Sequence, residues 1–256
     1  MQAVTDPFYS YRRESETEAG LDFERHTSLM TYQVTLCGVD GVVVASDRCQ
    51  VWHEKFGRPH EWTKNNVKKL FVDTKGKLAW TFSGGYFSDV TAHYLRDSLD
   101  ELPDYDAQSV ESAIKTCGNR ACDAFSTVTR AGITDILVLV FGEGRRILRA
   151  HIAREGTIVE TLGNQCVSGA TDSFVNFFPN RFCNDGKMFV DQLAVLAAYC
   201  VRQAHEQDTK YVDGLDIAIY RDSTRQFEEV KDRSIYWNAA ARLDADLKSL
   251  ISNWRL

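Results

Sequence analysis

Three residues able to carry out nucleophilic or acid–base chemistry stand close together in the sequence: Thr31, Asp47 and Lys69. Thr31 begins a segment that alternates apolar and polar residues in the manner of a β-strand. An Asp-Gly pair at 40–41 supplies a tight turn, and residues 42–46 are small and apolar, as in a strand covered on both faces. A hairpin of these two strands returns Asp47 to the beginning of the first strand, close to Thr31.

A carboxylate at the end of an apolar strand is costly unless it is paired, and the pair Lys68-Lys69 offers a partner. Along the strand predicted for residues 67–73, alternation sends the two lysines to opposite faces, so that one is exposed and the other can point inward. Two ordinary interpretations stay open at this point. Asp47 could face solvent at a strand end, and the lysines could be a solvated pair on an edge strand.

The order of a threonine, an acid, a lysine and a glycine turn resembles the active-site half of the proteasome-type β-subunits, a family of N-terminal nucleophile hydrolases. The resemblance is strongest to bacterial proteasome-related proteins that begin Met-Thr-Tyr. It covers most of residues 31–230 as a pattern and is specific mainly in residues 31–85. In that family the first residue of the mature chain, a threonine, is the catalyst, which implies that Thr31 is the nucleophile here.

The resemblance also implies the partners of Thr31. Asp47 and Lys69 would tune the hydroxyl, and Lys69 is the match because the lysine of the family precedes an aliphatic residue, here Leu70. An ammonium beside the threonine favours the deprotonated hydroxyl and keeps the neighbouring amine neutral. Ser83-Gly84-Gly85 matches the glycine turn whose backbone N–H stabilises the oxyanion, with Gly84 as the candidate.

Two further positions follow from the resemblance. Ser168 corresponds to a serine that hydrogen-bonds the amine of the threonine, although Val167 stands where a glycine is usual. Asp208 corresponds to a second aspartate of the family. The serine that normally follows it has no match, because Tyr211 and Asp213 occupy that region, and Asp213 could substitute. Turn chemistry at the end of an element explains both positions equally well.

The chemistry requires that nothing precede Thr31. A threonine hydroxyl needs a base, and a free α-amine with a pKa of about 7.7–8.0 can serve, whereas an amide nitrogen cannot. Met30 precedes Thr31, so we expect either translation from Met30 with removal of that methionine or cleavage of a leader after it. Residues 1–30 are thus interpreted as a leader, a propeptide or sequence upstream of the true start, and 31–256 as the hydrolase domain.

The predicted elements run as strands, two helices, strands, two helices, strands and a final helix. Helices grouped between antiparallel strand sets allow two sheets packed face to face with helices outside. We therefore expect an α+β fold, a four-layer αββα sandwich of two antiparallel sheets, as in N-terminal nucleophile hydrolases. The predicted strands are 31–37, 42–46, 67–73, 77–83, 136–141, 146–152, 158–162, 166–168, 215–220 and 227–230, and the predicted helices are 86–102, 107–127, 171–180, 187–206 and 237–254.

The residues between the first aspartate and the lysine depart from the pattern of the family. Residues 49–66 are expected to form a long polar connection that contains an insertion and could reshape the wall of a pocket. The arginine that commonly lies two positions after the aspartate is replaced by Cys49, with Arg48 one place early.

Composition excludes several classes of function. A formal charge of −6 without a basic stripe argues against nucleic acid as the main partner. No apolar run is long enough to span a bilayer, and residues 1–30 lack the apolar core of a secretory signal. The seven scattered cysteines show no metal-binding spacing and are predicted to be free thiols of a cytoplasmic protein.

The sequence therefore predicts a threonine-type peptidase or amide hydrolase that needs no cofactor and uses water as its second substrate. The expected substrate is a peptide or an unfolded protein, and the expected assembly is a homo-oligomeric ring, with or without an ATPase partner. Two alternatives share the fold: a noncatalytic ring subunit, and an amidase acting on a small amide. A cysteine hydrolase using Cys37 or Cys49 is a further alternative, although neither lies in a recognisable nucleophile signature.

Overall fold

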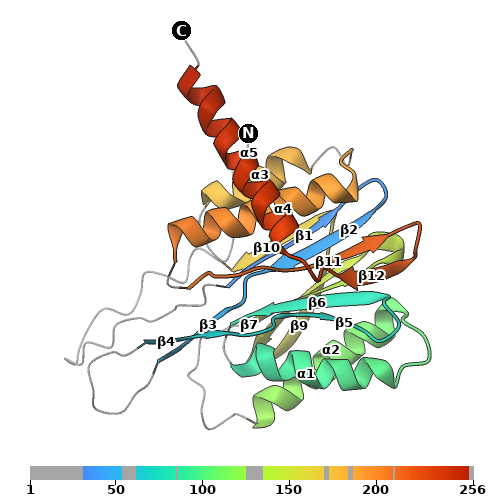
Figure 1. Ribbon diagram of the computed structural model, residues 1–256. Coiled ribbons are helices and arrows are strands. Elements are labelled where there is room, and N and C mark those ends of the chain that lie inside the picture. Colours follow the sequence, from blue (N-terminus) through green and yellow to red (C-terminus); the bar gives the residue numbers. More distant parts are fainter. Residues whose placement is uncertain are drawn as a thin grey trace, which may run out of the picture.

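The computed structural model describes residues 31–53, 62–84, 86–124, 135–169, 173–183, 187–209 and 211–253. Two five-stranded antiparallel sheets lie face to face, and helices cover their outer sides (Figure 1). The predicted four-layer αββα sandwich is therefore confirmed.

The first sheet contains the strand that begins after Thr31. Its order is β10-β1-β2-β11-β12, and all neighbours are antiparallel. Residues Tyr32, Val34 and Leu36 of β1 face outward, where they pack on the apolar side of α4. The bounds are β1 Tyr32–Cys37, β2 Gly41–Ser46, β10 Gln165–Gly169, β11 Asp216–Arg221 and β12 Gln226–Glu229.

The second sheet has the order β5-β6-β7-β8-β9 and is a simple antiparallel meander. Its outer face packs against α1 and α2, with Trp80 and Leu139 among the fully buried residues. The bounds are β5 Leu70–Val72, β6 Leu78–Ser83, β7 Asp135–Phe141, β8 Ile147–Ala153 and β9 Gly156–Leu162, and a short 3₁₀ turn Glu143–Arg145 joins β7 to β8.

The helices form the outer two layers. Helices α1 and α2 lie against the second sheet, and α4, flanked by α3 and α5, lies against the first (Figure 1). Helix α5 packs on α4 and then extends beyond the sandwich, and its last turns expose Leu250 and Ile251. The bounds are α1 Tyr86–Asp100, α2 Ala107–Ala124, α3 Ser173–Phe182, α4 Val190–Gln207 and α5 Ser234–Asn253.

The layer between the sheets changes character along its length. Near the turn at Gly38 it is apolar, with Cys37, Val42 and Val140 in one buried cluster. At the opposite end, where β1 begins, the buried side chains are polar: Gln33, Asp47, Lys69, Thr81, Ser83 and Asp216. Buried polar groups are costly unless they are paired, so this end is the place to look for a functional site.

The expected connection over residues 49–66 is wrong in part. Strands β3 Cys49–His53 and β4 Trp62–Asn66 form a separate two-stranded ribbon. The two strands were not predicted because neither shows the sustained apolar–polar alternation of a half-buried strand; β4, for example, contains the polar residues Thr63 and Asn65. Residues 54–61 lie outside the described part of the chain.

The strand predicted for residues 67–73 is also shorter than expected, since β5 covers only Leu70–Val72. The N–H of Val67 still donates to the carbonyl of Arg48 at 2.8 Å, so the chain follows the β3–β4 ribbon until it reaches Lys69. The predicted ends of the second and last helices, residues 125–127 and 254, lie outside the described residues.

Gly142, directly after β7 of the second sheet, lies close to the ring of Tyr220 in the first sheet, which leads to a testable prediction. A Cβ added there would come within 2.0 Å of the ring of Tyr220, whereas a Cβ at Gly163 meets nothing within 4 Å. We expect Gly142→Ala to lower the free energy of unfolding by about 1–3 kcal/mol, because the buried ring must move. Gly163→Ala is the matched control and should stay within about 0.5 kcal/mol. Urea denaturation measures both, and equal stability of the two variants would contradict this packing.

Candidate active site

Lys69 contacts both Thr31 and Asp47 at the polar end of the sandwich. The Nζ of Lys69 donates a hydrogen bond to the Oγ1 of Thr31 at 2.7 Å. The same Nζ lies 3.1 Å from Oδ2 and 3.3 Å from Oδ1 of Asp47. All three side chains are buried, with residue exposures of 6%, 2% and 0% for Thr31, Lys69 and Asp47. The structure thus brings together the three residues that the sequence placed at one site.

The β1–β2 hairpin puts Asp47 in this position. Its register pairs Gln33 with Ser46, so that Asp47 lies opposite Tyr32 and its N–H donates to the Tyr32 carbonyl at 3.0 Å. The N–H groups of Tyr32 and Cys49 donate to Oδ1 and Oδ2 of Asp47 at 2.9 Å and 2.7 Å. Both carboxylate oxygens therefore have backbone donors in addition to the ammonium of Lys69.

Burial dominates the electrostatics of the pair. Removal from water raises the pKa of the Asp47 carboxyl, while the charge of Lys69 and the two backbone N–H donors act in the opposite direction. Lys69 is also held by the backbone, because its Nζ donates to the carbonyl of Cys49. The three N–H donors of the ammonium are thus shared among the Asp47 carboxylate, the Cys49 carbonyl and the Thr31 hydroxyl.

Lys68 behaves as its sequence position predicted. Its side chain is 44% exposed and forms an ion pair with Glu229 at 2.6 Å. The two lysines therefore point in opposite directions, although both precede the first residue of β5. This contrast makes Lys68 a matched control for experiments on Lys69.

The glycine turn follows β6 directly. Gly84 has a φ of +128°, which L side chains rarely adopt, and a Cβ on it would lie 2.3 Å from Oδ1 of Asp135. Asp135 is buried, and its Oδ2 accepts the N–H of Ser88 at 2.8 Å in the first turn of α1. Both the backbone conformation and the crowding therefore require glycine at position 84. Gly85 lies outside the described residues.

The end of β10 lies against Thr31 from the other side. Strand pairing puts Gly169 opposite Tyr32 and Ser168 opposite Gln33. A Cβ on Gly169, whose φ is +104°, would lie 1.4 Å from the Thr31 carbonyl oxygen. The Oγ of Ser168 is buried and has no hydrogen-bond partner among the described residues.

Asp208 ends α4. Its N–H donates to the Ala204 carbonyl at 3.0 Å, and its own carbonyl accepts the N–H of Val212 at 3.0 Å. One carboxylate oxygen accepts the N–H of Tyr211 at 3.3 Å. The carbonyl of Asp213, in the same loop, accepts the N–H of Arg48 at 2.7 Å. These contacts connect the loop to the residue that follows Asp47.

Arg48 points toward β11 and contacts one acid that was not predicted as part of the site. Its guanidinium forms an ion pair at 2.6 Å with Asp216, which also pairs with Arg233 at 2.8 Å. Asp216 is buried at the start of β11. Asp135 and Asp216 were both missed, although they share one feature: each is an acid at the first residue of a mainly apolar strand.

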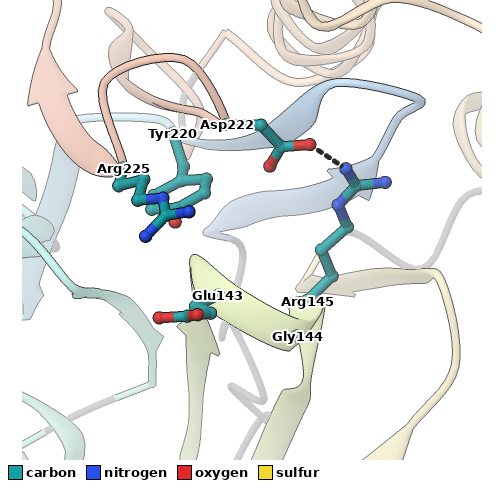
Figure 2. Close-up of a pocket in the computed structure, with 6 residues that line it drawn as sticks. All are labelled: Glu143, Gly144, Arg145, Tyr220, Asp222 and Arg225. Atoms are coloured by element: carbon teal, nitrogen blue, oxygen red, sulfur yellow. Dashed lines mark hydrogen bonds and ion pairs between the residues drawn. The ribbon is translucent and has the colours of Figure 1, made fainter.

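A separate hollow of about 400 Å³ lies at the other end of the sandwich (Figure 2). It lies beyond the last residues of β1, β7 and β11, whereas Thr31 precedes the first residue of β1. There Arg145 donates to the Gly38 and Val39 carbonyls and pairs with Asp222. These contacts connect the turn after β7 to the β1–β2 turn and to the turn after β11, at the end of the sandwich opposite to the Lys69–Asp47 pair. The lining residues are Glu143, Gly144, Arg145, Tyr220, Asp222 and Arg225.

All seven cysteines are buried and none forms a disulfide, as predicted. Burial raises the pKa of Cys37 to about 12, and Cys37 lies at the end of β1 opposite to Thr31. A thiol with so high a pKa is a poor nucleophile, which argues against a cysteine mechanism at that residue. Within the described ranges no cluster of three or more His, Cys, Asp or Glu side chains could hold a metal ion.

In the part of the chain that the structure describes, none of the helices combines the length and the apolar character needed to cross a membrane.

No protein-family model and no curated protein matches this sequence. Solved structures of Anbu proteins do match its fold, and each covers 88% of this chain. An Anbu mutant from Hyphomicrobium sp. strain MC1 has a TM-score of 0.64 at 14% identity over 98% of its own chain. Anbu from Yersinia bercovieri, described as an ancestral β-subunit, has a TM-score of 0.63 at 16% identity over 98% of its chain.

A helical assembly of the Anbu complex from Pseudomonas aeruginosa gives a TM-score of 0.61 at 13% identity over 97% of that chain. At such low identities the likeness establishes the fold alone, which this chain shares with the Anbu structures. It does not by itself assign an activity to Thr31.

The buried pair predicts a pH-dependent stability. Lys69→Met should lower the free energy of unfolding by about 3–5 kcal/mol at neutral pH, because it leaves the Asp47 carboxylate buried and unpaired. Burial raises the pKa of Asp47, and loss of the ammonium raises it further. An acid with a raised folded-state pKa favours folding below its unfolded pKa of about 3.9, and this contribution is lost as the pH rises through the folded pKa. The penalty of Lys69→Met should therefore grow with pH in urea denaturation.

Two variants serve as controls for this measurement. Lys68→Met removes an exposed lysine and should change stability little at any pH. Lys69→Met combined with Asp47→Asn removes the titrating carboxyl and should lose the pH dependence. A penalty for Lys69→Met that is the same at acid and neutral pH would contradict the assignment of a buried ion pair.

Proposed function

We propose that this protein is a threonine-type peptidase or amide hydrolase of the proteasome type in which Thr31 is the nucleophile. The observation that carries the proposal is the 2.7 Å hydrogen bond from Lys69 to the hydroxyl of Thr31, with Asp47 completely buried behind the lysine. Burying the charged Lys69–Asp47 pair costs desolvation free energy, which the protein would not need to spend on a purely structural contact. Perturbed, buried ionisable groups around a hydroxyl are typical of functional sites.

In the proposed reaction the Oγ1 of Thr31 attacks the carbonyl carbon of an amide bond. Its proton passes to the free α-amine of the same residue, directly or through a water molecule. The Lys69 ammonium stabilises the oxygen as it loses the proton, and Asp47 keeps the lysine in place. The negative charge that develops on the carbonyl oxygen is bound by the backbone N–H of the turn at Gly84.

The tetrahedral intermediate then collapses. The carbon–nitrogen bond breaks, the α-ammonium gives its proton to the departing amine, and the acyl group remains as an ester on Thr31. Water attacks this ester with the α-amine again as the base, which releases a carboxylic acid and restores the hydroxyl. The balance is one amide and one water converted to one amine and one acid, with no cofactor involved.

Ser168 and Asp208 are proposed to support the α-amine. Ser168 is paired with Gln33, two residues after Thr31, and its buried Oγ has no hydrogen-bond partner among the described residues, so we propose that it orients the amine. Asp208 is included because its loop contacts Arg48 through the carbonyl of Asp213. We therefore assign the catalytic set Thr31, Asp47, Lys69, Gly84, Ser168 and Asp208.

A noncatalytic ring subunit is the alternative that the fold serves equally well. The buried Lys69–Asp47 pair favours catalysis over this alternative, because it is directed at a hydroxyl and not at a structural contact. An assembly of several copies is proposed in either case. Its support is the helical assembly of the Anbu complex from Pseudomonas aeruginosa and the apolar residues exposed on the projecting end of α5.

Substitution of the nucleophile tests the proposal. Thr31→Ala should reduce hydrolysis of peptide substrates by at least about 10³-fold, because the atom that attacks is gone. Thr31→Ser should retain measurable activity, since it keeps a hydroxyl and an amine. Initial rates on a panel of fluorogenic peptides and small amides report both variants and separate a peptidase from an amidase. Full activity of Thr31→Ala would refute the proposal.

The N-terminus of the active protein provides a second test. Mass spectrometry of an active preparation should find Thr31 as the first residue, because an amide-linked threonine has no basic nitrogen to accept the hydroxyl proton. Selective acetylation of the α-amine at low pH should abolish the activity in proportion to the Thr31 N-termini modified. Undiminished, Thr31-dependent activity of a chain that still carries residues 1–30 would be incompatible with this base.

A further inference from the structure

A buried polar bridge joins the two sheets directly beside the candidate site. Gln33 lies on β1 two residues after Thr31, and its amide is buried in the layer between the sheets. Its Nε2 donates to the Oγ of Ser83 at 3.1 Å, and its Oε1 accepts the hydroxyl of Thr81. Thr81 and Ser83 are consecutive inward-facing residues of β6 in the opposite sheet, and both are buried.

Burying the amide of Gln33 at this position costs desolvation free energy. Farther along the same layer the contacts between the sheets are apolar, with Val42, Val44 and Val138 in one cluster. An apolar side chain of similar volume would fill the site of Gln33 without any polar group to desolvate. Paired hydrogen bonds add little net stability over such packing, so their advantage lies in the geometry they impose. One amide bound at two successive positions fixes both the separation of the strands and their register.

The bridge lies between the two halves of the proposed catalytic machinery. Thr31 leads into β1, and Gly84 follows Ser83 at the end of β6. The nucleophile therefore belongs to one sheet and the oxyanion turn to the other. The turn is held on its far side by Asp135, which packs against Gly84 and caps α1 at Ser88. Gln33 supplies the corresponding restraint on the side that faces Thr31.

We propose that Gln33 is a positioning residue that sets the distance between the Thr31 hydroxyl and the oxyanion-binding N–H of the Gly84 turn. The inference rests on the proposed function and extends it, since Gln33 acts on the reacting atoms only through β1 and β6. Misplacement of reacting groups by about 1 Å can reduce a rate by about 10²-fold. A loosened bridge should thus affect the chemical step more than substrate binding.

The test compares Gln33→Met with a matched control in the full chain. Rates are expressed per Thr31 N-terminus, counted by mass spectrometry, so that misfolded or unprocessed protein does not contribute. Gln33→Met should lower kcat by about 10–100-fold while KM stays within about 3-fold of the wild-type value. Thr35→Val removes a hydroxyl from the next inward-facing position of β1, which takes no part in the bridge, and should leave kcat within about 2-fold.

The partners of Gln33 provide an independent readout. Ser83→Ala and Thr81→Val should each lower kcat by less than Gln33→Met does, because each removes one of the two bonds. Adding either substitution to Gln33→Met should cost almost nothing further, as members of one interaction are not additive. Fully additive losses in kcat would overturn the proposal. Should Gln33→Met fail to fold, Ser83→Ala alone decides, and an unchanged kcat in that variant would also overturn it.

Failure of this inference is distinguishable from failure of the proposed function. If Gln33 serves stability alone, Gln33→Met lowers the melting temperature but leaves kcat per Thr31 N-terminus at the wild-type value, and the positioning role is refuted. In that case Thr31→Ala is still inactive, so the nucleophile stands. If Thr31→Ala keeps full activity, the proposed function falls and the positioning role falls with it.

Discussion

The burial of the Asp47 carboxylate and the Lys69 ammonium constrains the whole polar end of the sandwich. Asp47 follows β2 of the first sheet, and Lys69 precedes β5 of the second, so the ion pair at 3.1 Å crosses the sandwich. Neither charge is tolerable alone in that environment. Each feature of the surrounding backbone can be understood as meeting this demand: the hairpin register, the donors at Tyr32 and Cys49, and the detour of the chain through the β3–β4 ribbon.

The same constraint explains why the sandwich is apolar at one end and polar at the other. Apolar residues between the sheets hold the layers together near Gly38, where Arg145 also fastens the hairpin ends. At the opposite end the cohesion comes from directed contacts, namely the Lys69–Asp47 pair and the Gln33 bridge. Directed contacts fix geometry more sharply than apolar packing does. This division would serve the proposed site, in which a hydroxyl must be aligned with an oxyanion donor.

Much of the fold and the central trio could be predicted from the sequence, because both depend on local patterns. Alternation in residues 31–37 and the Asp40-Gly41 turn determine where Asp47 lies, and Lys69 is the inward member of an adjacent pair. The β3–β4 ribbon escaped prediction since its strands lack apolar alternation. Asp135, Asp216 and Gln33 were missed for a different reason: their partners are distant in the chain, and nothing in a single sequence shows such pairings. The catalytic roles of all six residues, Thr31, Asp47, Lys69, Gly84, Ser168 and Asp208, are proposals.

Direct detection of the covalent intermediate tests the central claim, that the hydroxyl of Thr31 attacks the substrate. The protein would be mixed with a peptide p-nitrophenyl ester, quenched in acid during turnover, digested and mapped by tandem mass spectrometry. An acyl group is expected on the side chain of an N-terminal Thr31, present in substoichiometric amounts and absent after the ester is consumed. An acyl group on another residue, such as Cys49, or turnover without any adduct on Thr31 would contradict it.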